Sequence, residues 1–148
     1  MSEHIKRSHN KTLLLYHVVC PVRYRRGVFT ETVKKGLVEI CGEIELRYDI
    51  HFVEVGADRD HVHFLIQSIP SESVSELVRV VKSLTAREIF ERHKEVKKRL
   101  WGGRFWTSGY YANTVGQYGN EEIIKRYVQE HGDKYEELYR DQPTLFDD

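Results

Sequence analysis

Apolar positions along the chain follow two repeats, one typical of strands and one typical of helices. Residues 12–20 (TLLLYHVVC) form a nearly continuous apolar run that Pro21 ends, which predicts a buried strand. Further strands are predicted at residues 50–55, 61–68 and 110–115. The short, turn-rich segment GADRD separates the second strand from the third, so we expect these two strands to form a hairpin.

Two segments between these strands carry apolar residues at helical spacing. Thr30 is a candidate N-cap, and the apolar positions after it predict a helix that reaches about residue 47. Ser73, followed three residues later by Glu76, has the form of a capping box. The apolar stripe that begins there predicts a second helix to about residue 90.

The order of these elements is strand, helix, strand, strand, helix, strand, which is the split βαβ pattern of ferredoxin-like folds. We therefore predict an α+β fold in which the helices cover one face of an antiparallel sheet. An additional C-terminal helix is predicted over residues 120–131, with Gly132 at its end. The last residues, 133–148, are expected to add a helical turn or two and an acidic tail to a core of about residues 11–132.

Length and composition fit one globular domain, residues 1–148, with 40% hydrophobic and 31% charged residues. No apolar run approaches the roughly 18 residues of a membrane span, and no secretory signal is visible, so we expect a cytoplasmic protein. The two cysteines, Cys20 and Cys41, are expected to be reduced and packed.

The formal net charge of zero hides a segregation of charge along the chain. Residues 79–104 hold nine Lys/Arg against three Glu, whereas residues 121–148 hold nine Asp/Glu against four Lys/Arg. A polyanion could bind the basic region, although a solvated helix surface explains such a run of charge equally well. Residues 93–106 (HKEVKKRLWGGRFW) combine basic residues, aromatics and a Gly pair, which favours a functional loop over a core element.

The basic, aromatic segments are the candidate nucleic-acid surface. The side chains that could bind phosphates are Arg23, Arg25, Arg26, Arg79, Lys82, Arg87, Lys97, Lys98, Arg99 and Arg104. The side chains that could stack on unpaired bases are Tyr24, Trp101, Phe105 and Trp106. Large aromatics are more often core or loop anchors, so we expect the two tryptophans to be structural.

One strand carries two histidines at a spacing that suits a metal ion. In HVHFLI, strand alternation points Val62 and Phe64 into the core and His61 and His63 together to the other face. Two imidazoles in this arrangement can hold one metal ion. Half-exposed strand histidines that bond to their neighbours explain the pattern as well, and composition alone favours that interpretation.

The predicted C-terminal helix offers a second pair, Tyr127 and His131, one turn apart on the same face. His131 could complete a three-histidine metal site with the Tyr127 hydroxyl beside it. A phenol, with its usual pKa of about 10, is a weak nucleophile, so such chemistry needs a metal to polarise the phosphate. Tyr127 could equally be a packed residue, and Tyr135 and Tyr139 continue the spacing, so spacing alone does not choose among the three.

Four separated segments resemble one known family. DHVHFLIQSIP, VRVVKSLTAREIF, KRLWGGRFWTSGYYANTVG and IIKRYVQEHG resemble, in order and spacing, the TnpA-type transposases of bacterial insertion sequences and their relatives associated with repeated chromosomal hairpins. This family is the single-tyrosine branch of the HUH superfamily, and the resemblance covers about residues 13–132. It implies a metal-dependent homodimer that acts on single-stranded DNA hairpins at element ends.

The resemblance also implies residue roles and a reaction. The HUH pair maps onto His61 and His63, and the nucleophile maps onto Tyr127. Attack by the tyrosine leaves a 5′-phosphotyrosine and a free 3′-hydroxyl, and the reverse reaction rejoins strands. In this family the tyrosine helix of one protomer commonly reaches the HUH site of the other, which implies composite active sites.

The implied cofactor is a divalent metal, Mg²⁺ or Mn²⁺. His131 stands where many relatives carry Gln as the third ligand, and an imidazole shifts preference toward softer ions, which predicts tolerance of Mn²⁺. No nucleotide cofactor is expected, because the phosphotyrosine conserves the energy of the phosphodiester and the chain has neither a P-loop nor a dinucleotide fingerprint.

Two alternative functions stay open from the sequence. A domesticated relative would cut chromosomal hairpins without mobilising its own gene. A nucleic-acid-binding module would keep the basic surface without catalysis, although pure binding needs neither a metal site nor a nucleophile.

Overall fold

The computed structural model describes residues 14–23, 28–58, 60–68, 72–100, 103–116 and 136–141. Its elements follow the predicted order, with one extra short helix and one extra strand. They are β1 (Leu14–Pro21), α1 (Glu31–Arg47), β2 (Ile50–Ala57), β3 (His61–Ser68), α2 (Val74–Arg92), α3 (Lys94–Arg99), β4 (Tyr111–Gly116) and β5 (Glu136–Arg140).

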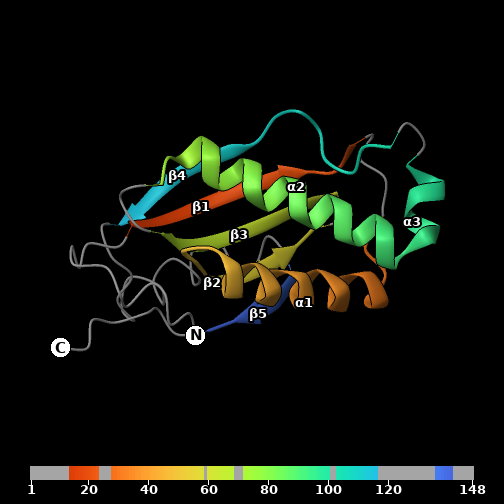
Figure 1. The fold of residues 1–148 in the computed structure, drawn as a ribbon, viewed down its shortest axis with the longest axis horizontal. Helices are drawn as coiled ribbons and strands as arrows, with labels where there is room; N and C mark the ends of the chain where they lie inside the picture. The colour runs from red at the N-terminus through yellow and green to blue at the C-terminus, as the bar shows by residue number, and fades with distance from the viewer. Residues whose placement is uncertain are drawn as a thin grey trace.

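The strands form one antiparallel sheet in the order β4-β1-β3-β2-β5. Helices α1 and α2 lie side by side across one face of this sheet, and α3 follows at the far end of α2 (Figure 1). The split βαβ order and the one-sided helix layer confirm the predicted ferredoxin-like α+β fold. The predicted helix over residues 120–131 lies outside the described residues.

Both long helices begin where the sequence predicts. The Thr30 hydroxyl accepts the Val33 N–H at 3.3 Å, and the Ser73 hydroxyl accepts the Glu76 N–H at 3.1 Å. Each bond satisfies one of the N–H groups that a helix leaves without an internal partner in its first turn. Neither helix has a stretch apolar enough to cross a lipid bilayer in the part of the chain that the structure describes.

The main core lies between the helices and the sheet. Its largest fully buried members come from both layers, with Leu37 and Ile40 on α1, Leu77 on α2 and Phe64 on β3. Cys20 and Cys41 are both free and buried, and burial raises the pKa of the Cys20 thiol to about 12. The two thiols are therefore packed groups, as predicted.

The prediction of a loop rather than a core element over residues 93–106 is wrong for the described part of this segment. The segment includes α3, and Val96 and Leu100 are buried with Phe105 and Trp106 in the main core. Phe105 is only 1% exposed, so the prediction that it stacks on bases is wrong. Val96 and Leu100 are spaced one helical turn apart, but two apolar positions among so many basic residues are too few to predict a helix.

Backbone bonds hold the end of this segment against the end of β1. The Arg23 N–H donates to the Phe105 carbonyl at 2.8 Å, and the Thr107 N–H donates to the Pro21 carbonyl at 3.0 Å. Between these bonds, Trp106 forms a single antiparallel bridge with Val22. The segment is therefore an extension of the sheet, and it carries Trp106 into the core.

The helical turn or two expected within residues 133–148 is wrong where the structure describes this segment, because Glu136–Arg140 is the strand β5. Glutamate favours helices, but the outer edge of β2 offers unpaired backbone groups, and pairing with them overrides local preference. Leu138 and Tyr139 pack against the main core, and the Lys34 ammonium on α1 binds the Glu136 carboxylate at 2.6 Å.

A buried histidine, His51, also connects β5 to the rest of the domain. His51 is fully buried on β2, with Nδ1 2.5 Å from a Glu45 carboxylate oxygen and Nε2 3.6 Å from Asp141. The same Glu45 oxygen accepts the Phe52 N–H at 2.9 Å. The imidazole therefore lies between a carboxylate of α1 and a carboxylate at the end of β5.

Gly36 lies where α1 crosses the C-terminal end of α2. A Cβ added at Gly36 would be 2.3 Å from Nε2 of the buried His93 and 3.2 Å from its Cε1. Alanine is better than glycine in a helix by about 1 kcal/mol, whereas overpacking a core costs about 1–3 kcal/mol. We expect Gly36→Ala to lower the free energy of unfolding by about 1 kcal/mol, measured by urea denaturation.

The control removes the ring that causes the clash. In a His93→Ala background, Gly36→Ala is expected to be neutral or stabilising, because only helix propensity is left. Equal destabilisation with and without the His93 ring would show that the close approach of the two helices is not the reason for glycine at this position.

Candidate active site

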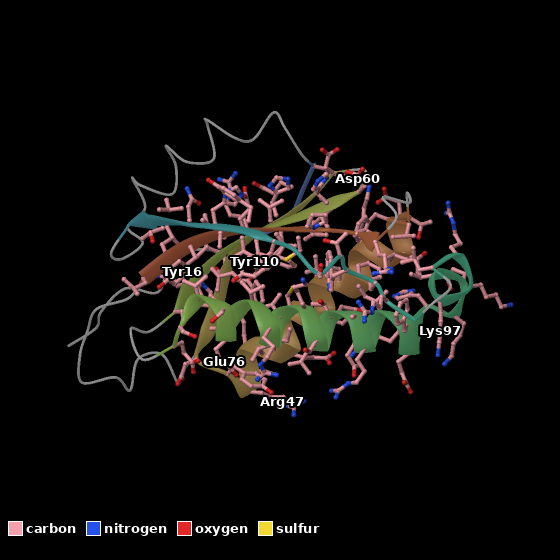
Figure 2. All side chains as sticks on the ribbon, turned by 90° about the horizontal axis from the view of Figure 1, so that it is seen from above. Tyr16, Arg47, Asp60, Glu76, Lys97 and Tyr110 are labelled. Atoms are coloured by element: carbon pink, nitrogen blue, oxygen red, sulfur yellow. The ribbon has the colours of Figure 1, made fainter. Side chains whose placement is uncertain are left out.

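The face of the sheet opposite the helices carries the predicted histidine pair. His61 and His63 are half-buried on β3, whereas Val62 and Phe64 between and after them are completely buried in the main core. In Figure 2, Asp60, which immediately precedes the pair, lies on the side of the sheet away from Glu76 and Arg47 of the helices. The prediction that both imidazoles share the face away from the core is confirmed.

His61 has a carboxylate partner. Its Nδ1 lies 2.5 Å from an Asp60 carboxylate oxygen, and the Asp60 carbonyl accepts the Val22 N–H at 2.8 Å, which fixes the backbone at this position. A carboxylate that accepts the Nδ1–H of a histidine sets its tautomer and leaves the Nε2 lone pair to a ligand. Metal-binding histidines commonly have such a partner.

His63 has a histidine partner on the neighbouring strand. The His17 Nε2 lies 3.3 Å from the His63 Nδ1, with the two rings within 16° of parallel. Strand register places His17, on β1, on the same face as Leu65 and His63. His17 belongs to no motif in the sequence, although a histidine in an otherwise apolar strand is a usable signal of a functional position.

These contacts fit a divalent metal at His61 and His63. In both residues Nδ1 is engaged by a neighbouring side chain, so Nε2 is the nitrogen that a metal would take from each ring. Within the described ranges, no three His, Cys, Asp or Glu side chains gather closely enough to hold a metal ion. The predicted third ligand, His131, and the predicted nucleophile, Tyr127, lie outside those ranges, so both stay predictions.

One of the three candidate tyrosines is badly placed for attack. Tyr139 on β5 pairs with Val55 and packs against the main core, on the helix-covered face of the sheet. Burial, followed by the charge of Asp141, raises the pKa of Tyr139 to about 12. A raised pKa and the wrong face both argue against Tyr139 as the nucleophile.

Two of the predicted phosphate-binding residues on α2 already have partners within the protein. Arg79 forms an ion pair with Glu76, and the Arg79 guanidinium lowers the pKa of that carboxyl. The Lys82 ammonium donates to the Thr107 carbonyl at 2.7 Å and lies 5.9 Å from the centre of the Tyr110 ring. Lys82 therefore holds the segment before β4 against α2, and both side chains line a cleft of about 310 Å³.

The other basic candidates lie elsewhere. Lys97, Lys98 and Arg99 are exposed on α3, at the end of the molecule where Figure 2 labels Lys97. Arg87 and Arg104 are exposed, and Arg23 is half-buried beside Phe105. Arg79 and Lys82 therefore lie on the first half of α2, and Lys97, Lys98 and Arg99 lie on α3. The remaining candidates lie outside the described residues: Arg25, Arg26, Tyr24 and Trp101.

Comparisons with known proteins agree with this fold and with the resemblance. Residues 10–131 match the model of the IS200-like transposase family. The chain is 30% identical over 121 residues to the ISDra2 transposase TnpA of Deinococcus radiodurans, covering 82% of this chain and 86% of that protein. It is 26% identical over 122 residues to the transposase for insertion sequence element IS200 of Salmonella typhimurium, covering 82% and 79% respectively.

A solved structure gives the same result for the fold. The crystal structure of a candidate transposase from Deinococcus radiodurans R1 superposes with a TM-score of 0.65 at 26% identity, covering 84% of this chain and 92% of that one. The family match spans most of the chain and contains both the histidine pair and Tyr127. The chain therefore belongs to the IS200-like transposase family, the TnpA-type transposases of bacterial insertion sequences.

Proposed function

We propose that this transposase cuts and rejoins single-stranded DNA at hairpin-bearing element ends, with Tyr127 as nucleophile and a divalent metal at His61 and His63. The observation that carries the proposal is the histidine pair itself. Both rings lie on one face of β3 with Nδ1 engaged, by Asp60 and by His17, which suits ligation through Nε2.

The metal would be Mg²⁺ or Mn²⁺, held by His61, His63 and His131. When bound, such an ion polarises a phosphate oxygen and neutralises charge that develops during displacement at phosphorus. Imidazole ligands favour Mn²⁺ over Mg²⁺, so we expect Mn²⁺ to support cleavage. Asp60 and His17 would keep the two strand ligands in place.

In the proposed reaction, the Tyr127 oxygen attacks the phosphorus of the scissile phosphodiester. A bond forms between that oxygen and phosphorus, and the bond from phosphorus to the 3′-oxygen breaks. The phenol loses its proton and the 3′-oxygen gains one, giving a 5′-phosphotyrosine and a free 3′-hydroxyl. The number of phosphodiester bonds is unchanged, so rejoining by attack of a 3′-hydroxyl needs no nucleotide cofactor.

The basic groups would hold the DNA. Exposed Lys98 and Arg99 on α3 suit phosphate contacts. Arg87 on α2 is also exposed, but its guanidinium lies 3.6 Å from the Glu88 carboxylate. Lys82 bonds to backbone carbonyls and Arg79 to Glu76, so we assign them a smaller share of the binding energy than the sequence suggests. We further propose a homodimer in which the tyrosine helix of one protomer completes the histidine site of the other.

Mixing two inactive variants tests the function and the composite site together. His61→Ala lacks a metal ligand and Tyr127→Phe lacks the nucleophile, so each homodimer alone is expected to be inactive. If the sites form between protomers, a mixture contains one site with intact His61 and Tyr127 in each heterodimer. We expect the mixture to regain up to about a quarter of wild-type cleavage of an end-labelled hairpin strand, because roughly half the dimers carry one good site of two.

The outcomes distinguish the parts of the proposal. Inactive single variants with an inactive mixture would mean that each site is built from one chain, provided that subunit exchange is verified with differently tagged protomers. Substantial cleavage by either variant alone would contradict the proposed roles of His61 or Tyr127.

A further inference from the structure

His17 lies against the histidine pair although it belongs to a different strand and to no motif. Its side chain is 7% exposed, between His63 on β3 and the exposed Tyr111 on β4. The His17 and His63 ring centres are 5.5 Å apart, and the Tyr111 ring meets His17 edge to face at 6.4 Å. These contacts on both sides fix the orientation of the His17 ring.

The short distance between the two rings links their tautomers. With both imidazoles neutral, one hydrogen lies between the His17 Nε2 and the His63 Nδ1, 3.3 Å apart. If His63 donates this hydrogen, its Nε2 keeps a lone pair. If His17 donates it, His63 carries its own hydrogen on Nε2, and that nitrogen has no lone pair for a metal.

The position of His17 in its strand is otherwise apolar. Leu15, two residues earlier on the same face, is fully buried with Val53 and Leu65 in a second small core cluster. Burying a polar ring in such surroundings is costly unless the ring is hydrogen-bonded. An apolar residue would pack there equally well but would offer no acceptor to His63.

We infer that His17 is a positioning residue that fixes His63 as the Nδ1–H tautomer and directs its Nε2 toward the metal position. His17 then sets the tautomer of His63, as the Asp60 carboxylate sets the tautomer of His61. The inference rests on the proposed metal site. It adds a residue from β1 to a site whose predicted residues come from β3 and the C-terminal segment.

Two substitutions separate the acceptor from the ring. His17→Phe keeps an aromatic ring of similar shape but has no acceptor, whereas the side-chain oxygen of His17→Gln can take the place of Nε2. The tautomer of His63 can be observed in the metal-free, full-length protein by long-range ¹H–¹⁵N correlation, at a pH well above the ordinary histidine pKa of about 6.5. Calorimetric titration with Mn²⁺ measures the affinity of the site.

We expect His63 to be the Nδ1–H tautomer in the wild type and in His17→Gln, and to shift toward Nε2–H in His17→Phe. Loss of such a partner typically costs 10–100-fold in metal affinity, so we expect a loss of about that size in His17→Phe and at least partial rescue in His17→Gln. Thermal unfolding midpoints of the three proteins show whether the fold has changed.

A His63 tautomer that does not change in His17→Phe, or a wild type with its hydrogen on Nε2, would overturn the inference. Equal Mn²⁺ affinity of the wild type and His17→Phe would also overturn it. A wild type that binds no Mn²⁺, but whose His63 tautomer still follows residue 17, would contradict the proposed metal site and support the coupling between the two histidines.

Discussion

Replacement of His63 by alanine is expected to reduce strand cleavage by more than about 100-fold, because loss of a partner that merely supports a metal ligand already costs 10–100-fold. His63 would supply one of the two strand ligands, and its loss also removes the contact with His17. Cleavage of an end-labelled hairpin strand, measured at saturating Mn²⁺, gives the size of the effect.

The fold should survive this change, which makes the result informative. His63 is half-buried and points away from the main core, so truncating its side chain leaves that core intact. Glu39→Ala, an exposed change on α1 on the opposite side of the sheet, is the matched control and should keep wild-type cleavage. Cleavage by His63→Ala within a few-fold of the control would show that His63 is not a metal ligand.

Trp106→Ala is expected to cause the largest loss of stability, about 3–5 kcal/mol in the free energy of unfolding. Trp106 is 5% exposed, and its ring centre lies 4.6 Å from that of Phe105 and 6.4 Å from that of Phe64. Its Nε1–H donates to the Thr85 hydroxyl at 3.0 Å, and that hydroxyl donates in turn to the Val81 carbonyl at 2.6 Å. Thermal or urea unfolding measures the loss.

Trp106→Phe is the matched variant, since it keeps an aromatic ring and removes the indole donor. The Thr85 hydroxyl retains its bond to Val81, so we expect a loss nearer to 1 kcal/mol, the typical contribution of one hydrogen bond. If Trp106→Ala instead weakened DNA binding at unchanged stability, Trp106 would be a base-stacking residue, and its assignment to the core would be wrong.

The sequence predicts most of the architecture because the relevant signals are local. Thr30 and Ser73 cap the helices that they precede, and the alternation around Val62 and Phe64 assigns each side chain of β3 to the correct face. Strand order follows from the split βαβ pattern, since consecutive elements in such a fold have few ways to pack.

The predictions that fail concern residues whose structure depends on long-range contacts, and such contacts leave no periodic signal in the sequence. Glu136–Arg140 is a strand because the edge of β2 is open to pairing, and Phe105 is buried because backbone bonds to the end of β1 hold its segment in place. His17 also leaves no periodic signal in the sequence. Its contact with His63 joins residues 46 positions apart and depends on the register of β1 against β3.

The most direct test of the central claim is a search for a covalent bond between protein and DNA. Wild type and Tyr127→Phe are incubated with end-labelled single-stranded DNA that carries the native flanking hairpin, with Mn²⁺, with Mg²⁺ or with a chelator, and separated by denaturing electrophoresis. We predict a covalent protein–DNA band that requires both Tyr127 and a divalent metal. Retention of the correct hairpin without any covalent product would contradict the proposal and identify a DNA-binding module without catalysis.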